Sequence, residues 1–321
     1  MKMLVTGGSG FIGSHLCDRL VADGHEVTVF DDNSTGPIRN IEGLVSDKRL
    51  RFQKGSILDK SELEKHVKNV DYIFHLAAAV GVFNIIENPL SSLLTNIRGT
   101  ENVLELANNS GIPVFLTSSS EVYGKNISDS LKESDDRVLG SPTTLRWSYS
   151  EAKAIDESLA FAYHMEKNLE TRIVRFFNTV GPRQLGSYGM VVPRFVKSAI
   201  LNQDLTIFGN GHQTRCFAHV LDVIDAIILV AFASNTVGKV VNIGNNQEIS
   251  INNLAERITT ETNSTSKIIY KPYDAAYGQG FEDMERRVPN IDLIRELVGW
   301  TPTRDLSTII RDISNEMRLA P

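Results

Sequence analysis

Tyr149 and Lys153 are four residues apart in the segment RWSYSEAKAID, near the start of a predicted helix. Residues at this spacing share one face of a helix, so the lysine ammonium would lie beside the tyrosine phenol. A neighbouring cation favours the phenolate, and we expect the pKa of Tyr149 to be lowered toward neutrality. Such a phenolate could take a proton from a hydroxyl group. The same pair is also common on solvated helix faces, where it does no chemistry.

Three serines and a carboxylate follow an apolar run that predicts a strand, Val114–Thr117. The residues after it are Ser118, Ser119, Ser120 and Glu121. In a doubly wound sheet the ligand binds outside the carboxyl ends of the strands, so we expect these side chains to point at a substrate. A serine-rich loop that caps its own backbone is the alternative for Ser118 and Ser120.

The first sixteen residues, MKMLVTGGSGFIGSHL, predict a strand, a tight turn and a helix N-terminus. Such a turn presents backbone N–H groups and the positive end of a helix dipole, which together hold a pyrophosphate. Taken alone, the glycines could simply be turn residues. The turn contains Gly7, Gly8, Gly10 and Gly13.

Asp31 ends the next strand run, Val27–Phe30, and follows Gly13 by eighteen positions. This is close to the spacing of the acid that binds a ribose diol in dinucleotide-binding folds. A carboxylate there would repel a 2′-phosphate, and no Arg occurs from Asp32 to Thr35. The pattern therefore favours NAD over NADP.

Strand-like runs alternate with helical patterns along the first 177 residues. Alternation of this kind implies right-handed βαβ units and a parallel sheet covered on both faces. The expected fold is α/β, with a doubly wound Rossmann domain over 1–177. A smaller substrate-binding lobe is expected over 178–321, from which some strands and helices return to the Rossmann domain. The predicted strands are Met3–Val5, Val27–Phe30, Leu50–Gln53, Tyr72–His75, Val114–Thr117 and Arg172–Arg175; the predicted helices are Phe11–Val21, Ser61–Val67, Pro89–Ala107, Trp147–Lys167 and Pro193–Leu201.

Composition limits the kinds of partner, metal site and cellular location that can be expected. The 321 residues carry a formal net charge of −6, which does not suggest nucleic acid as the main partner. Cys17 and Cys216 have neither metal-ligand nor disulfide-framework spacing, so we expect no metal and a cytoplasmic protein with reduced thiols. The N-terminus lacks the pattern of a signal peptide, and no apolar run is long enough to predict a membrane span.

Several motifs together resemble the extended short-chain dehydrogenase/reductase family, the NAD-dependent nucleotide-sugar epimerases and dehydratases. They are TGGSGFIGSHL, the Asp31-Asp32 pair followed by STG, HLAAAVG, SSSEVYG, YSEAK and RFFNTVGPRQ, which span nearly the whole chain. The resemblance implies that Ser119, Tyr149 and Lys153 form a catalytic triad. Tyr149 would be the base on the sugar 4-hydroxyl, Ser119 would bind that oxygen, and Lys153 would also hold the nicotinamide ribose.

The resemblance also implies the binding residues. Ser56 and Ile57 stand where many members have Asp and an apolar residue beside adenine, which leaves the contact to the adenine amino group open. Arginine suits forked phosphate contacts, although any single one could form a surface ion pair instead. The implied NAD contacts are Gly7, Gly10, Phe11, Ile12, Asp31, Asp32, Ser34, Ser56, Ile57, Leu76, Ala77, Ala79, Thr117, Tyr149, Lys153 and Phe176; the implied substrate contacts are Val82, Glu121, Asn178, Val192, Arg215, Arg287 and Asn290.

Glu121 and Ser120 bear on which reaction the resemblance implies. Oxidation of the sugar at C4 acidifies the hydrogen at C5, and Glu121 argues against a plain 4-epimerase, which needs no base there. Related 4,6-dehydratases carry Thr-Asp-Glu, in which the Glu removes H5 and the Asp protonates the departing C6 hydroxyl. This chain keeps the Glu but has Ser120, a poor acid, in place of the Asp.

UDP-glucuronate decarboxylases share the Ser-Glu arrangement but usually have Ser-Pro-Ala-Ser-Pro after the His-Leu-Ala strand end. Here the loop Ala78–Phe83 is apolar and offers no donor to a carboxylate. Over the whole chain the resemblance is strongest to the UDP-N-acetylglucosamine 5,6-dehydratase of tunicamycin biosynthesis. That resemblance implies C4 oxidation, removal of H5 by Glu121, loss of the C6 hydroxyl and return of hydride to C4.

Two further alternatives concern the class of protein and its assembly. A nucleotide-binding regulatory module that has lost catalysis is the alternative to an enzyme. The amphipathic segments Pro89–Ala107 and Trp147–Lys167 could pair with their copies across a twofold axis, as the family's homodimers do, or could merely cover the sheet.

Overall fold

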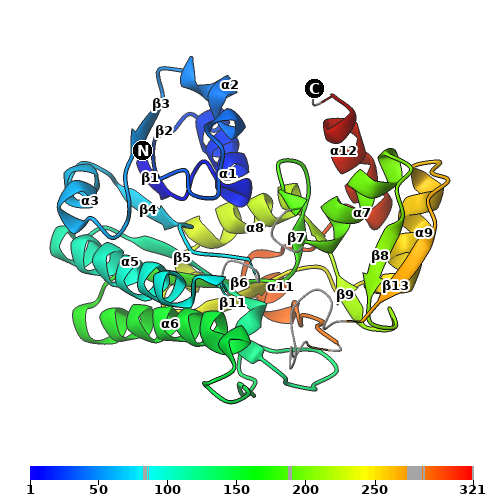
Figure 1. Cartoon of the computed structure of the whole chain (residues 1–321). Helices are drawn as coiled ribbons and strands as arrows, with labels where there is room; N and C mark the ends of the chain where they lie inside the picture. Colours follow the sequence, from blue (N-terminus) through cyan, green and yellow to red (C-terminus); the bar gives the residue numbers. More distant parts are fainter. Residues whose placement is uncertain (82–84, 86, 187–189, 273–283, 285, 320–321) are drawn as a thin grey trace.

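A parallel sheet of seven strands forms the centre of the computed structural model, which describes residues 1–81, 85, 87–186, 190–272, 284 and 286–319 (Figure 1). Every neighbouring pair in this sheet is parallel, and helices cover both faces, so the expected doubly wound α/β fold is confirmed. In spatial order the strands are β3 (Leu50–Lys54), β2 (Glu26–Asp31), β1 (Lys2–Thr6), β4 (Tyr72–His75), β5 (Val114–Ser119), β6 (Thr171–Phe176) and β11 (Val240–Ile243).

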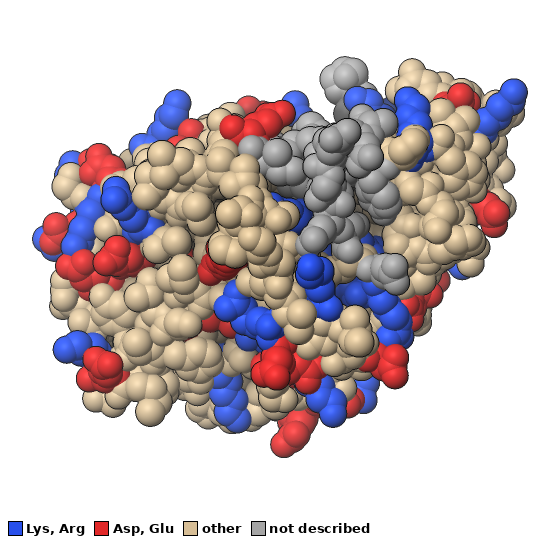
Figure 2. Space-filling view, turned by 60° about the horizontal axis from the view of Figure 1, so that its bottom comes forward, with Lys and Arg blue, Asp and Glu red and all other residues tan. Residues whose placement is uncertain are grey.

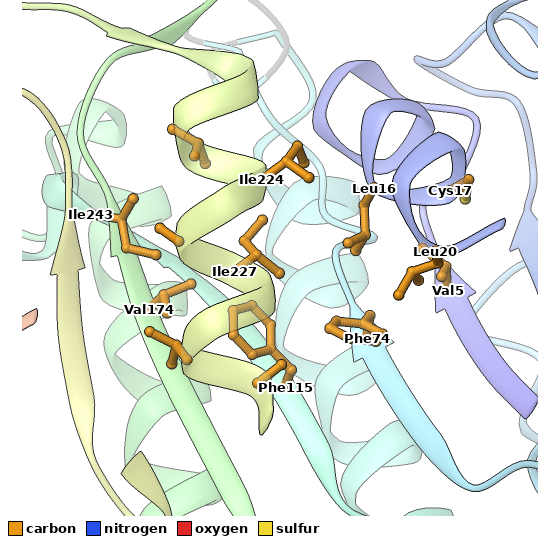
Figure 3. Packing of buried hydrophobic residues seen from close by; sticks show 14 of the residues in the cluster. Val5, Leu16, Cys17, Leu20, Phe74, Phe115, Val174, Ile224, Ile227 and Ile243 are labelled. Carbon is orange, nitrogen blue, oxygen red and sulfur yellow. The ribbon is translucent and has the colours of Figure 1, made fainter. Parts of the chain in front are cut away.

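Side chains of the strands point alternately to the two faces of the sheet, and each face carries its own apolar core. On β1, Met3 and Val5 face one core while Leu4 faces the other, because successive side chains of a strand point to opposite faces. The first core packs against α1 (Phe11–Ala22), α8 (Val220–Phe232) and α11 (Asp292–Val298), part of which is seen in Figure 3. The second packs against α3 (Lys60–Val67), α5 (Pro89–Ser110) and α6 (Ser148–Lys167).

The strand order reverses between β1 and β4. From β1 the chain proceeds outward through β2 and β3, and then returns to β4 on the other side of β1. In open α/β sheets, ligands bind in the crevice outside the carboxyl ends of the strands at such a point. The glycine turn after β1, the Leu76–Ala79 segment after β4 and the serines after β5 all meet at this edge.

The seventh strand of the sheet comes from late in the chain. β11 pairs with β6 in parallel register, Val240 opposite Ile173 and Ile243 opposite Phe176. It follows α8, which packs on the same face of the sheet as α1. Elements after residue 177 thus extend the sheet and also form a separate core. The division into a Rossmann domain over 1–177 and a substrate-binding lobe over 178–321 stays a prediction.

A third apolar core lies outside the sheet. Leu205, Ile207, Leu254 and Ile309 are fully buried in it. In Figure 1 the helices and strands of this core lie on the opposite side of the molecule from α3 and α5. They are α7 (Val191–Ile200), β8 (Leu205–Phe208), α9 (Ile251–Glu261), β13 (Ile268–Lys271) and α12 (Leu306–Leu319).

Short elements complete the fold. Among the described residues, three pairs of strands lie outside the large sheet: β8 with β13, β7 with β10, and β9 with β12. In the part of the chain described, no helix is both long and apolar enough to cross a membrane. The remaining elements are η1 (Ile38–Asn40), α2 (Glu42–Val45), η2 (Ser120–Tyr123), η3 (Leu145–Trp147), β7 (Thr179–Val180), β9 (Thr214–Cys216), β10 (Ala218–His219), η5 (Ser234–Thr236) and β12 (Glu248–Ser250).

Candidate active site

The glycine turn between β1 and α1 is too tightly packed for side chains. Gly7 has φ +71°, and a Cβ there would lie 2.6 Å from the Ala77 nitrogen. A Cβ on Gly13 would lie 2.2 Å from the Gly7 carbonyl oxygen. Helix α1 begins at Phe11, so the N–H groups of its first turn point toward the crevice, as an anion such as a pyrophosphate requires. The turn therefore fits the dinucleotide that the sequence predicted.

Asp31 at the end of β2 is buried and joins two loops. One carboxylate oxygen accepts a hydrogen bond from the Ser9 nitrogen at 3.0 Å, and the other accepts from the Asn33 nitrogen at 2.8 Å. The side chain is thereby fixed beside the glycine turn, where a carboxylate can still accept bonds from a ribose. Asp32 is exposed and accepts from the Ser34 nitrogen at 2.8 Å.

The segment after β4 is fixed by polar contacts of its backbone. The Ala77 nitrogen donates to the Thr6 hydroxyl at 3.3 Å, and Ala79 exchanges two hydrogen bonds with the Asn96 amide. Leu76 and Ala77 thus lie against the glycine turn, as the dinucleotide hypothesis requires. Ile57 is 5% exposed, and a Cβ on Gly99 would lie 2.2 Å from its side chain, so packing against α5 accounts for most of its surface.

The side chains of the predicted triad lie near the carboxyl end of β5, and their catalytic role stays a prediction. The Tyr149 phenol is hydrogen-bonded to the Ser119 side chain, and Ser119 also accepts from the Glu121 nitrogen at 3.2 Å. The Lys153 ammonium, which lies one turn along α6, donates to the Thr117 carbonyl at 3.0 Å. The end of β5 with the adjoining η2 and the start of α6, which are separated in the sequence, therefore meet at this point.

The expected lowering of the Tyr149 pKa is wrong in this structure. Burial raises the pKa of Tyr149, the negative charges of Glu121 and Asp156 raise it further, and the hydrogen bond with Ser119 opposes them. Lys153 does not compensate, because its ammonium is engaged by the Thr117 carbonyl and by Asp156 at 3.2 Å. The prediction considered only the lysine four residues from Tyr149, because the sequence spacing did not reveal that two carboxylates lie near the phenol.

Glu121 lies between two arginines. Its carboxylate is 2.6 Å from an Arg146 nitrogen and 2.8 Å from an Arg287 nitrogen, and both arginines are 6% exposed. Burial works against the charged carboxylate, but the two guanidinium groups prevail and lower the pKa of Glu121 to about 2. Arg287 also donates to the Ser120 hydroxyl at 3.3 Å. A carboxylate held ionised in this way is a weak base.

Arg146 was not among the residues singled out from the sequence. It lies in η3, the single turn that leads into α6, and its guanidinium stacks over the neighbouring Trp147 ring with 5.2 Å to the centroid. Its position three residues before Tyr149 was the available signal. A cation so close to a candidate catalytic tyrosine could have been included on that ground.

The other predicted substrate residues are dispersed. Asn178 donates to the Cys216 carbonyl at 3.0 Å, which brings it beside Arg215. The side chain of Val192 is fully buried in the apolar core of α7, so a substrate contact there would be made by the backbone and stays a prediction. Asn290 is hydrogen-bonded to Asp292 and Leu131. Val82 lies outside the described residues.

Charges of both signs are spread over the protein surface. On the face shown in Figure 2, several Lys and Arg side chains gather near the centre, while Asp and Glu lie mostly around them. Among the described residues, no group of His, Cys, Asp and Glu could hold a metal ion.

Comparisons with known proteins agree with this geometry. The chain matches the family model described as GDP-mannose 4,6 dehydratase over residues 4–313. The UDP-N-acetyl-alpha-D-glucosaminuronate decarboxylase of Bacillus cytotoxicus is 39% identical over 302 residues, 94% of this chain and 92% of that protein. UDP-glucuronic acid decarboxylase 1 of Xenopus tropicalis is 37% identical over 94% of this chain and 68% of its own length. The UDP-glucuronic acid 4-epimerase of Bacillus cereus, solved with UDP-glucuronic acid and NAD, aligns with a TM-score of 0.89 at 27% identity, covering 99% of both chains.

The doubly wound sheet, the glycine turn and the Ser-Tyr-Lys triad define an extended short-chain dehydrogenase/reductase. More particularly, this chain belongs to the GDP-mannose 4,6-dehydratase family, whose relatives here are NAD-dependent nucleotide-sugar dehydratases, decarboxylases and epimerases. The more specific resemblance to a 5,6-dehydratase stays a prediction.

Proposed function

We propose that the protein is an NAD-dependent decarboxylase of UDP-uronic acids, UDP-glucuronate or its 2-acetamido analogue. The observation that carries the proposal is the Arg146–Glu121–Arg287 cluster beside Tyr149. The 39% identity to a UDP-N-acetylglucosaminuronate decarboxylase supports it. This differs from the dehydration that the sequence favoured, and the electrostatics of the cluster give the reason.

The residues of the crevice fit NAD. The glycine turn would hold the pyrophosphate, Asp31 would bind the adenine ribose, and Leu76 and Ala77 would flank the middle of the dinucleotide. Phe11, Ile12 and Gly10 would contribute the first turn of α1, and Lys153 would hold the nicotinamide ribose. When bound, NAD accepts hydride from C4 of the sugar and later returns it.

Tyr149 would take the proton of the sugar 4-hydroxyl. Its hydrogen bond to Ser119 places a second hydroxyl beside that oxygen. Because burial and two carboxylates keep the phenol protonated in this structure, its ionisation requires additional positive charge beside it. The nicotinamide ring of bound NAD, which is positively charged, would supply that charge.

The arginine pair suits a carboxylate on C5. Two buried guanidinium groups lie together beside Tyr149, and arginine forms forked, charge-assisted hydrogen bonds with carboxylates, so the pair could bind the carboxylate of a uronic acid. Once C4 is a ketone, the C5–C6 bond breaks, its electron pair moves into an enolate over C5, C4 and the C4 oxygen, and carbon dioxide leaves. A proton from water then adds to C5 in place of the lost carboxylate and restores the C4 ketone.

Decarboxylation also agrees with the weak basicity of Glu121. Elimination across C5 and C6 requires a base at C5, and a carboxylate with a pKa of about 2 removes such a proton poorly. Decarboxylation requires no base there. The cluster thus disfavours the step that a 5,6-dehydratase needs.

UDP-N-acetylglucosamine 5,6-dehydration is the second candidate. Ser120, which replaces the acid of 4,6-dehydratases, and the apolar residues 78–80 favour it, because an uncharged C6 substituent would suit them. For this reaction Glu121 would have to leave its arginines when the substrate binds.

A substrate panel decides between these reactions. The purified protein is incubated separately with UDP-glucuronate, UDP-N-acetylglucosaminuronate and UDP-N-acetylglucosamine, and the products are followed by mass spectrometry and NMR. We expect loss of carbon dioxide from a UDP-uronic acid and formation of a UDP-pentose. If both uronic acids remain unchanged while UDP-N-acetylglucosamine loses water and gives a vinyl proton signal, dehydration replaces the proposal. Formation of only a 4-epimer would replace it with epimerisation.

A further inference from the structure

Asp156 is a buried carboxylate in contact with the lysine of the triad. Both side chains project from α6, three residues apart, and Asp156 and Lys153 are 0% and 2% exposed. Their oxygen and nitrogen atoms are 3.2 Å apart, and the same ammonium donates to the Thr117 carbonyl at 3.0 Å. Two acceptors therefore fix the ammonium between α6 and the end of β5.

A series of buried polar side chains leads from Asp156 toward the glycine turn. Asp156 lies close to Thr100 of α5, whose hydroxyl is 3.1 Å from the His75 Nε2 atom. The other ring nitrogen of His75 is 2.7 Å from the hydroxyl of Thr6, which ends β1. Burial lowers the pKa of His75 to about 3, so the imidazole is neutral and adds no charge to this series.

We propose that Asp156 is a positioning residue that fixes the Lys153 ammonium, offsets its charge and so sets the pH at which Tyr149 loses its proton. The inference rests on the proposed role of Tyr149 as the base at C4. It holds for either decarboxylation or dehydration, because both begin with that oxidation. A buried carboxylate that touches the lysine reduces the positive charge available to stabilise a phenolate.

The charged groups around the Tyr149 phenol determine how far its pKa should change when the charge of Asp156 is removed. Glu121 from η2 and Asp156 from α6 act on Tyr149, and Glu121 is already neutralised by its two arginines. Around Asp156 itself, Lys153 lies on the same helix, and Glu157 beside it is engaged by Arg175 at 2.7 Å. Burial raises the pKa of Asp156, and the Lys153 ammonium opposes this by favouring the carboxylate.

The test is Asp156→Asn, which keeps the size of the side chain and an oxygen acceptor but removes the charge. Two quantities are measured as a function of pH with NAD bound. One is kcat/KM for the UDP-sugar that is turned over. The other is the phenolate absorbance of Tyr149, taken as the difference from the same protein carrying Tyr149→Phe. Without the opposing charge, the pKa of Tyr149 falls, so the acid limb of the profile and the phenolate titration should both move down by about one pH unit.

Glu151→Gln is the matched control. Glu151 lies on the same helix and is only half-buried, so its loss changes the net charge equally and should leave both curves in place. If Asp156→Asn does not fold, Asp156→Ser is measured in the same way. If the pH profile of kcat/KM and the phenolate titration of the folded variant coincide with those of the active wild-type protein, the proposed role of Asp156 is overturned. Absence of turnover in the wild-type protein would instead count against the proposed function, and the phenolate titration would still test Asp156.

Discussion

The carboxylate of Glu121 lies 2.8 Å from the guanidinium of Arg287, although 165 residues separate them in the chain. Arg287 follows β13 in sequence, whereas Glu121 lies in η2 directly after β5. A hydrogen bond from the Leu131 nitrogen to the Val288 carbonyl at 2.8 Å connects the two regions next to this pair. The pair therefore joins the sheet edge to the C-terminal part of the chain, beside the tyrosine that begins the proposed reaction.

Arg287→Met should lower kcat/KM for the UDP-uronic acid by at least about 30-fold. The substitution removes one of two cations proposed to bind the substrate carboxylate, and truncating one partner of a buried charge pair costs about 2–5 kcal/mol. Steady-state kinetics on both proteins measure the effect. Arg286→Met is the control, because the neighbouring Arg286 forms exposed ion pairs with Glu248 and Asp129. Equal losses in both variants would remove Arg287 from the substrate site.

Glu121→Gln should make the protein less sensitive to acid. The folded-state pKa of Glu121 is depressed to about 2, so its stabilisation is present above the unfolded pKa and is lost as pH falls through about 4.5 to 2. The size of the shift corresponds to about 3 kcal/mol. Urea unfolding at pH 6 and pH 3 measures it. The wild-type protein should lose more stability between these pH values than the variant, and identical losses would contradict the depressed pKa.

Gly13→Ala should abolish NAD binding and destabilise the fold. Its Cβ would lie 2.2 Å from a backbone oxygen and 2.8 Å from the Gly8 Cα, so the turn would have to shift. Overpacking of this kind costs about 1–3 kcal/mol. Gly43→Ala is a matched control, since a Cβ there meets nothing within 4 Å. Fluorescence titration with NAD and thermal unfolding compare the variants; wild-type affinity in Gly13→Ala would show that the turn does not hold the pyrophosphate.

We expect the protein to form a homodimer through α5 and α6, and Ile155→Glu should then convert it into monomers. Helices α5 and α6 pack side by side at one side of the molecule in Figure 1, and α6 exposes Ile155 at 43% and Met165 at 77%. A charge within an apolar interface is costly to bury, whereas on a free surface it would have little effect. Sedimentation velocity of the wild-type protein and the variant measures the change. Wild-type protein that sediments as a monomer would show that these helices only cover the sheet.

The fold could be predicted, and the triad proposed, because their signals are local. The glycine turn, the alternating strand and helix patterns and the Tyr-Lys spacing each lie within a short stretch of sequence. The Arg146–Glu121–Arg287 cluster could not be predicted, because no spacing relates residues brought together by packing. The Lys153–Asp156 spacing was visible, but its burial was not. The prediction that the Tyr149 pKa is lowered was wrong for this reason. The effect of a nearby ammonium on a phenol depends on which carboxylates also lie close to that ammonium.

The most direct test of the central claim is release of labelled carbon dioxide from UDP-glucuronate and UDP-N-acetylglucosaminuronate that carry ¹³C at C6. With NAD present, the wild-type protein should release the label from at least one of them and leave an unlabelled UDP-pentose, and Tyr149→Phe should release it at least about 100 times more slowly. Label retained in every product, or release at the wild-type rate from Tyr149→Phe, would contradict the account.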